Sequence, residues 1–142
     1  MCPVCTGGAG TVSAYAMDHD SGALSAVSGS PFGGAGPNPL ALTVDPKGRL
    51  LYAANYAGTV SGYQINSAGA LTMISGSPFP VGQSLSSIVV DPSGKFVYVT
   101  DDSLKQVFGF MIGTDGSLTA ISGSPFGLSG NPSDIVVLGS SQ

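Results

Sequence analysis

The chain is poor in charge and lacks two residue types altogether. Of its 142 residues, 8% are charged, and it contains neither Glu nor Trp. Its four cations, Lys47, Arg49, Lys95 and Lys105, are too scattered to form the basic stripe that binds a nucleic acid or an anionic membrane. The sequence therefore predicts no nucleic-acid partner and no membrane partner, and the net charge of −4 mainly favours solubility.

Long hydrophobic runs are also missing. No apolar stretch approaches the ~20 residues of a membrane-spanning helix, and the N-terminus does not combine a basic start with an apolar core as a signal peptide does. The sequence thus assigns no compartment. Yet 42% of the residues are hydrophobic, and they alternate with polar ones, which favours a folded β protein of one domain.

Residues that bind metals are scarce as well. Cys2 and Cys5 form a Cys-x-x-Cys pair without a second pair, and residues three apart in a strand point to opposite faces. Residues 18–22, Asp-His-Asp-Ser-Gly, resemble the start of a calcium loop but lack its distal Glu. We interpret them as a hairpin turn with a solvated His19. No metal and no cofactor is expected.

What the chain does have is a repeat. Ser-Gly-Ser-Pro-Phe begins at Ser28, Ser75 and Ser122, in steps of 47 residues. Asp-Pro at residues 45–46 returns at 91–92, and Thr-Val-Ser at 59–61 matches 11–13. A period of ~40 to ~50 residues with several short strands per unit is typical of propeller blades. The sequence therefore predicts an all-β fold, a β-propeller built of four-stranded antiparallel blades.

Two complete blades and two incomplete ends are expected. The complete blades cover residues 40–79 and 86–126, each with four strands closed by polar turns. Residues 1–32 supply the second, third and fourth strands of a partial blade, because residues 2–6 align with residues 50–54 of the repeat. Residues 134–138, Asp-Ile-Val-Val-Leu, match a lone first strand. The chain thus holds about three blades' worth of strands, with complementary ends.

The complementary ends leave several arrangements open. Propellers need ~4 to 8 blades to close around a channel, so three blades do not close alone. The chain is either a piece of a longer propeller or a self-associating unit in which residues 134–138 of one copy complete the N-terminal blade of another. Two copies would give six blades, and a head-to-tail joint that fails to close would give a filament. We expect a homo-oligomer, with a dimer favoured.

The repeat resembles a known family. Asp-Pro-Lys-Gly-Arg-Leu-Leu-Tyr-Ala-Ala-Asn at residues 45–55, Val-Ser-Gly-Tyr-Gln-Ile at 60–65 and the Ser-Gly-Ser-Pro-Phe copies are similar to lactonase-type seven-bladed propellers related to 6-phosphogluconolactonase. Tyr-Val-Thr-Asp at 98–101 is similar to the Tyr-Val-Thr-Asn repeat of related propellers. The resemblance implies hydrolysis of sugar lactones. No residue of this chain matches a catalytic motif of the family, so no catalytic residue is predicted.

Candidate binding residues are expected at one end of the propeller. Connections between second and third strands and links between blades share that end, and loops on a rigid scaffold are where binding usually occurs. We call this the loop end. A polar mouth there could bind a sugar or a cation, but we favour a structural role, because Asn and Asp are ordinary turn residues. The candidate residues are Asn38, Asn55, Tyr56, Gln83, Asp101, Asp102 and Asn131.

Other side chains have simpler interpretations. Arg49 and Lys95 follow equivalent Asp-Pro-x-Gly turns and could hold an anion, but a solvated cation beside Asp45 or Asp91 is the favoured interpretation. An alternating apolar stripe on the third strands is expected to pack between blades. Its members are Tyr15, Met17, Tyr63, Ile65, Phe110 and Ile112.

Together these observations predict a non-catalytic propeller module that self-assembles, with binding of ligands or partners on the loop end as a candidate role. The alternative is a lactone hydrolase whose site is completed by other blades or subunits. An assay of lactone hydrolysis on the assembled protein distinguishes the two.

Overall fold

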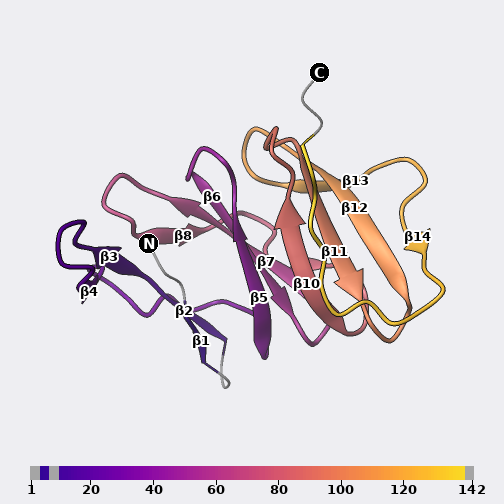
Figure 1. The fold of residues 1–142 in the computed structure, drawn as a ribbon, viewed down its shortest axis with the longest axis horizontal. Helices are drawn as coiled ribbons and strands as arrows, with labels where there is room; N and C mark the ends of the chain where they lie inside the picture. Colours follow the sequence, from indigo (N-terminus) through magenta and orange to yellow (C-terminus); the bar gives the residue numbers. More distant parts are fainter. Residues whose placement is uncertain (1–3, 7–9, 140–142) are drawn as a thin grey trace.

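The computed structural model describes residues 4–6 and 10–139, and the described chain contains strands and loops without a helix (Figure 1). Cys2, one half of the Cys-x-x-Cys pair, lies outside these residues. The strands are β1 (Val4–Thr6), β2 (Thr11–Ser13), β3 (Tyr15–Met17), β4 (Leu24–Ala26), β5 (Pro39–Val44), β6 (Leu50–Asn55), β7 (Thr59–Ile65), β8 (Leu71–Met73), β9 (Phe79–Pro80), β10 (Leu85–Val90), β11 (Phe96–Asp101), β12 (Gln106–Ile112), β13 (Leu118–Ala120) and β14 (Phe126–Gly127).

Residues 39–80 and 85–127 form two antiparallel sheets, which we call blade 2 and blade 3. In blade 2 the strand order is β5-β6-β7-β8, and β9 pairs with the free half of β7. Blade 3 repeats this order with β10-β11-β12-β13 and adds β14 beside β12. Asp-Pro-x-Gly turns separate the first and second strands of both blades, and Ser-Gly-Ser-Pro follows the fourth strands.

Blade 1, residues 4–32, is less regular. Its third strand divides at Ala14 into β2, which pairs with β1, and β3, which pairs with β4. The bridge from Val12 to Phe32 occupies the place of the β7–β9 and β12–β14 pairs. Blade 1 therefore shows the second, third and fourth strands that the repeat predicts.

The N-terminal alignment was wrong by one residue. In blade 2, Asn55 pairs with Thr59, whereas in blade 1 it is Thr6 that pairs with Thr11. Thr6 therefore takes the place of Asn55, and not of Ala54 as the alignment predicted. The β1–β2 connection is one residue longer than its counterpart, and a slip of one residue reverses which face of a strand each side chain occupies.

The Ser-Gly-Ser-Pro-Phe motif has a structural role in all three blades. The second serine of each copy accepts a hydrogen bond from the middle of the third strand: Ser77 Oγ accepts from Gly62 N at 2.9 Å. Ser124 repeats this contact with Gly109 at 2.9 Å, and Ser30 with Ala14 at 3.0 Å. Two short strands share one edge of the third strand, and this N–H lies between their two pairings. The serine hydroxyl takes the place of a backbone carbonyl, so the N–H of the third strand keeps an acceptor.

Packing at this place also explains a change in residue size. A Cβ at Gly62 would lie 3.1 Å from Ile74 Cδ1, and one at Gly109 would lie 2.8 Å from Ile121 Cδ1. Blade 1 carries Ala14 at the matching position, and there Val27 replaces the isoleucine. The shorter valine leaves room for the extra methyl group.

The core lies between blades. One cluster joins blades 2 and 3, where Tyr52 and Val60 meet Ile88, Val97 and Val99. A second joins blades 1 and 2, where Val12 and Ala35 meet Leu51, Tyr63 and Leu71. The predicted stripe on the third strands is accordingly core at these junctions, with Tyr63 buried and Ile65, Phe110 and Ile112 half-buried. In blade 1 the stripe is open, since Met17 is 46% exposed.

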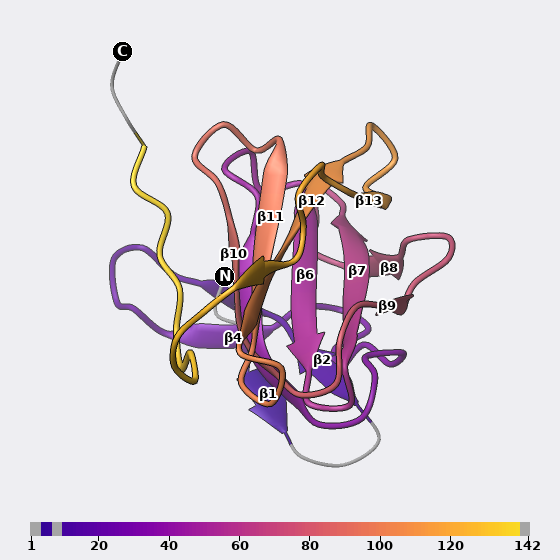
Figure 2. The same ribbon diagram turned by 90° about the vertical axis from the view of Figure 1, so that its right-hand side faces the viewer.

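Residues 134–138 differ from the prediction of a first strand, because the structure assigns them no strand. They nevertheless run beside β10. Ser86 Oγ donates to the Pro132 carbonyl at 3.0 Å, and Ser87 Oγ donates to Asp134 Oδ1 at 2.6 Å. A strand requires a backbone ladder, and within the described chain this segment has none. Figure 2 shows it running along the β10 side of blade 3.

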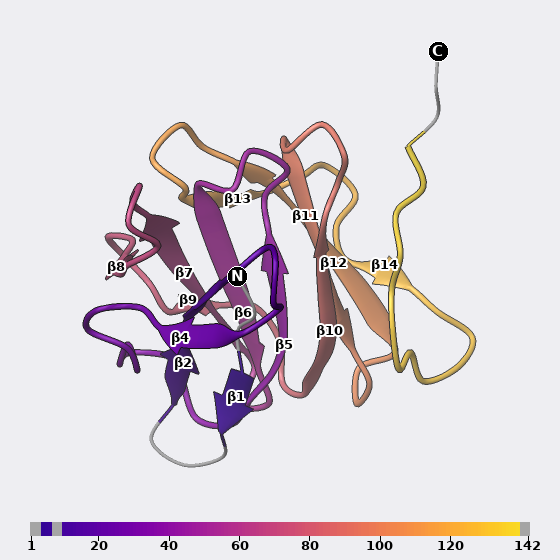
Figure 3. The same ribbon diagram turned by 60° about the vertical axis from the view of Figure 1, so that its left-hand side comes forward.

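Blade 1 and residues 128–139 lie on opposite sides of the molecule. Figure 3 shows β1 and β4 in front of blade 2 on one side and residues 128–139 beside blade 3 on the other. Within residues 4–6 and 10–139, no helix is long and apolar enough to span a membrane.

Candidate functional site

At the loop end, Asp101 is buried and fully occupied. Its Oδ2 accepts hydrogen bonds from the backbone N–H groups of Gln83 (2.6 Å) and Ser84 (3.2 Å). Its Oδ1 accepts from the N–H groups of Ser103 (3.0 Å) and Leu104 (2.9 Å), and from the Ser103 hydroxyl. The side chain thus ties the link between blades to the β11–β12 turn.

The charge of Asp101 is held by these contacts. Burial alone would raise its pKa, but hydrogen bonds from Gln83, Leu104 and Ser84 outweigh burial, so the pKa lies below its usual value. A side chain at Gly82 would collide with this carboxylate, since a Cβ there would lie 2.3 Å from Oδ2. Asp101 therefore has a structural role, and we call its set of hydrogen bonds the clasp at Asp101.

Asn55 occupies the same position in blade 2 and is also buried. Its Nδ2 donates to the hydroxyls of Thr59 and Ser61, both at 3.0 Å. Its Oδ1 has no hydrogen-bond partner among the described residues. In the link before blade 2, Pro37 takes the place of Gln83 and has no N–H to donate.

The remaining candidates lie at the surface of the same end. Tyr56 is exposed, and its N–H donates to the Asn38 carbonyl at 2.9 Å. Asp102 makes the equivalent bond to Ser84 at 3.1 Å. Gln83 and Asn131 are exposed, and among described residues Asn131 forms no hydrogen bond with the others. Of the candidates, Asn55 and Asp101 are buried and the others reach the surface. That they bind a ligand stays a prediction.

The opposite end carries two neighbouring hollows, of about 230 and 200 Å³, at the junction of blades 2 and 3. Arg49, Leu50 and Thr114 line both. The Arg49 side chain is mostly exposed, and its Nε lies 4.0 Å from a carboxylate oxygen of Asp45. Asp45 also accepts from the backbone N–H of Leu50 at 2.7 Å. This agrees with a solvated turn cation beside an acidic turn.

The segment that resembles a calcium loop, residues 18–22, is a turn. Asp18 Oδ1 accepts from Asp20 N, Ser21 N and the Ser21 hydroxyl. The Ser21 hydroxyl is the main cause that holds the pKa of Asp18 below its usual value. In the described part of the chain, no three His, Cys, Asp or Glu residues are grouped to hold a metal ion.

Two open surfaces stand out beyond these candidates. The middle strands β6 and β11 each pair on both edges, whereas β1 pairs with β2 alone among described strands. On the far side, Val136 and Leu138 are 77% and 86% exposed, while Ile135 and Val137 turn toward blade 3. This alternation is that of a strand with one face covered.

Blades of this order and repeat define a β-propeller segment. A family model described as "Lactonase, 7-bladed beta-propeller" matches residues 2–77. The match covers more than half of the chain, so the chain belongs to this family of lactonase-type propellers.

Solved structures agree on the fold. The Pseudomonas aeruginosa periplasmic gluconolactonase PpgL is 20% identical, with a TM-score of 0.70, over 84% of this chain and 37% of that one. A functionally unknown protein from Desulfotomaculum acetoxidans is 24% identical, with a TM-score of 0.69, over 79% of this chain and 34% of the other. A Bacteroides fragilis protein provisionally named a 6-phosphogluconolactonase is 22% identical, with a TM-score of 0.66, over 89% and 35%.

The chain therefore spans about a third of the length of these structures. At this identity the likeness shows the fold alone. No curated protein matches the sequence.

The sequence analysis missed the hydroxyl of Tyr52, which donates to the Gly116 carbonyl at 2.7 Å across the junction of blades 2 and 3. A signal was available, since Tyr52 recurs as Tyr98 one repeat later. The acceptor is a backbone atom in a turn, which residue types do not reveal.

Proposed function

We propose that the chain is a non-catalytic propeller module that self-assembles by strand exchange, with two copies forming six blades. Residues 134–138 of one copy would complete blade 1 of the other. The observation that carries the proposal is the pair of complementary ends: a free edge on β1 and an extended segment with one face covered.

The internal blades support a specific register for this exchange. In blade 2, Ala41 of the first strand pairs with Ala54 of the second, and in blade 3 Ser87 pairs with Thr100. Ala41 and Ser87 each follow a bulge, because the pairing skips one residue after Pro39 and after Leu85. The repeat aligns Pro132 with Pro39 and Leu85, and therefore aligns Asp134 with Ala41 and Ser87. Asp134 would then face Cys5 of the second copy.

A disulfide tests this register. Directly opposed Cα atoms in an antiparallel pair lie about 4.5 to 5.5 Å apart, within reach of a disulfide. In a Cys2→Ser background, Asp134→Cys should form covalent oligomers with Cys5 under mild oxidation, and reductant should dissolve them. A closed pair gives a dimer band, and an open joint gives a ladder.

Val136→Cys is the matched control. Val136 is highly exposed, so random collision would favour a cysteine there. In the proposed register it is displaced by two residues from Cys5, at about 7 to 8 Å. Equal cross-linking of the two variants, or none with Asp134→Cys, would contradict the strand exchange.

The alternative is a lactone hydrolase completed by other blades or subunits. Similarity to the gluconolactonase of Pseudomonas aeruginosa favours it. The purified assembly would be tested for hydrolysis of a sugar lactone, with Arg49→Ala as the variant because Arg49 lines the two hollows. Hydrolysis that disappears in a folded Arg49→Ala protein would overturn the non-catalytic proposal.

A further inference from the structure

The junction between blades 2 and 3 is a template for a contact between copies. Tyr52 is completely buried there, and its hydroxyl donates to the Gly116 carbonyl. Gly116 has a φ of +86°, and a Cβ at that residue would lie 2.6 Å from Ile74 and 3.0 Å from Leu50. The β12–β13 turn of blade 3 thus packs against the face of blade 2, and this close contact requires glycine at residue 116.

Blade 3 carries the same face on its outer side without a turn on it. Tyr98 pairs with Val89 as Tyr52 pairs with Thr43, so the two tyrosines are equivalent. The Tyr98 hydroxyl has no hydrogen-bond partner among the described residues. Ile121 lies with Tyr98 at Gly109 and is half-buried. Other apolar residues of this blade and the segment after it are also half-buried or exposed: Phe96, Phe126 (42%) and Leu128 (40%).

Blade 1 carries the other half of the junction. Its turn over residues 18–22 ends in Gly22, which has a φ of +71° and no atom within 4 Å of a built Cβ. Gly22 precedes the fourth strand as Gly116 does. Its N–H donates to the Asp18 carbonyl four residues before it, whereas that of Gly116 donates to Gly113 three residues before it, so the blade 1 turn is one residue longer. Beside it, Met17 and Leu24 are 46% and 54% exposed.

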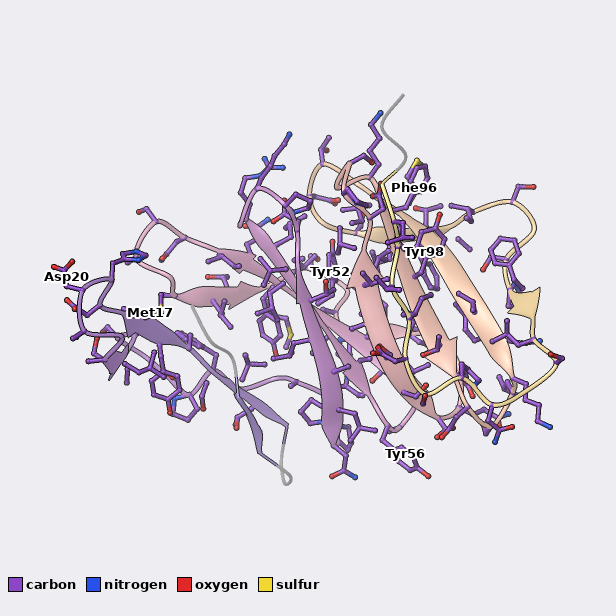
Figure 4. All side chains as sticks on the ribbon, in the orientation of Figure 1. Met17, Asp20, Tyr52, Tyr56, Phe96 and Tyr98 are labelled. Carbon is purple, nitrogen blue, oxygen red and sulfur yellow. The ribbon has the colours of Figure 1, made fainter. Side chains whose placement is uncertain are left out.

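We infer that the outer face of blade 3 binds the blade 1 turn of a second copy, with the Tyr98 hydroxyl donating to the partner's Gly22 carbonyl. Figure 4 places Tyr98 and Met17 on opposite sides of the molecule, so one chain cannot make this contact. The inference rests on the proposed self-assembly and specifies the side-chain contact that orients it.

Charge agrees with a second copy as the occupant. At the internal junction, Arg49 lines the hollow beside the turn residues Gly113 and Thr114. On blade 3 the equivalent cation is Lys95, and the turn that would approach it carries Asp18 and Asp20. The two open surfaces therefore have opposite charge at their rim, and moderate salt should weaken the contact.

The test is Tyr98→Phe, followed by light scattering over a dilution series. Loss of one buried hydrogen bond that leaves its acceptor unpaired should weaken association by about 5- to 30-fold. Tyr56→Phe is the matched control, because Tyr56 is exposed at the loop end and should leave association unchanged. Circular dichroism verifies that each variant is folded.

The outcomes separate the two claims. A wild-type protein that stays at the mass of one chain at every concentration overturns both the self-assembly and this contact. A wild-type oligomer whose dissociation constant is unchanged within about twofold by Tyr98→Phe overturns the contact alone. Weakening in Tyr98→Phe but not in Tyr56→Phe supports it.

Discussion

The junction of blades 2 and 3 and the outer face of blade 3 are made of the same residue types in the same register. Tyr52 and Ile74 are almost completely buried in the first. Their equivalents Tyr98 and Ile121 are half-buried in the second. Figure 4 shows Tyr52 between the two blades and Tyr98 in the outer part of the molecule.

The burial of these side chains therefore depends on the neighbouring blade and not on the sequence of the blade itself. A repeat unit covers an apolar face only when another unit stacks on it. The exposed face of blade 3 is therefore a junction surface without its second half. Predictions that contrast equivalent residues test this interpretation.

The largest contrast is expected between Tyr52→Ala and Tyr98→Ala. Under dilute conditions, Tyr52→Ala should lower the free energy of unfolding by about 3 to 5 kcal/mol, because it empties a buried site and leaves the Gly116 carbonyl unpaired. Tyr98→Ala should cost about 1 to 2 kcal/mol, because its ring is partly hydrated. Urea denaturation measures both. Equal losses would show that the two faces are buried alike.

The second contrast is between Asp101→Ala and Asn55→Ala at the loop end. Removing the Asp101 carboxylate leaves four backbone N–H groups without an acceptor, which should cost about 2 to 4 kcal/mol. Asn55→Ala should cost less, about 1 to 2 kcal/mol, because its Oδ1 is already unpaired. The same denaturation experiment applies, and a larger loss for Asn55→Ala would contradict the clasp at Asp101.

Acid should remove the contribution of the Asp101 carboxylate to stability. The pKa of Asp101 is lower in the folded protein than in the unfolded chain, so its contribution to stability is complete above about pH 4 and is lost as pH falls through the folded pKa. Asp91 acts in the same direction, since hydrogen bonds from its turn outweigh its burial and lower its pKa. Melting temperatures from pH 7 to pH 2 should fall below pH 4, and less steeply in Asp101→Asn.

The smallest contrast is between Gly62→Ala and Gly109→Ala. The added methyl at Gly62 meets Ile74, which is held under the Gly116 turn, so the cost should be about 1 to 2 kcal/mol. At Gly109 it meets Ile121, which is half-exposed and free to move aside, so the cost should stay below about 1 kcal/mol. Thermal melting of both variants measures the difference. The reverse order would contradict the open face.

Much of the fold was predictable because turn residues recur at fixed intervals. Asp45 and Asp91 each accept hydrogen bonds from the N–H groups of the following turn, so one side chain fixes where two strands meet. The register of β1 was not predictable, because one extra residue in its connection is invisible to a constant repeat length. The break at Ala14 had no sequence signal.

Less of the candidate site was predictable. The repeat brought Asn55 and Asp101 to equivalent buried positions, but their hydrogen bonds depend on which backbone N–H groups approach them. The Gln83 N–H reaches Asp101, whereas Asn55 Oδ1 has no partner among the described residues. Residues 134–138 were expected as a strand from their alternating apolar pattern, and the missing factor is a pairing strand.

The most direct test of self-assembly is the mass of the wild-type protein in solution, measured by light scattering on a sizing column. The account predicts about twice the 14.0 kDa chain mass for six blades in a closed pair, or larger multiples for an open joint. A mass of one chain at all concentrations would contradict it, and would assign the open faces to blades outside this sequence.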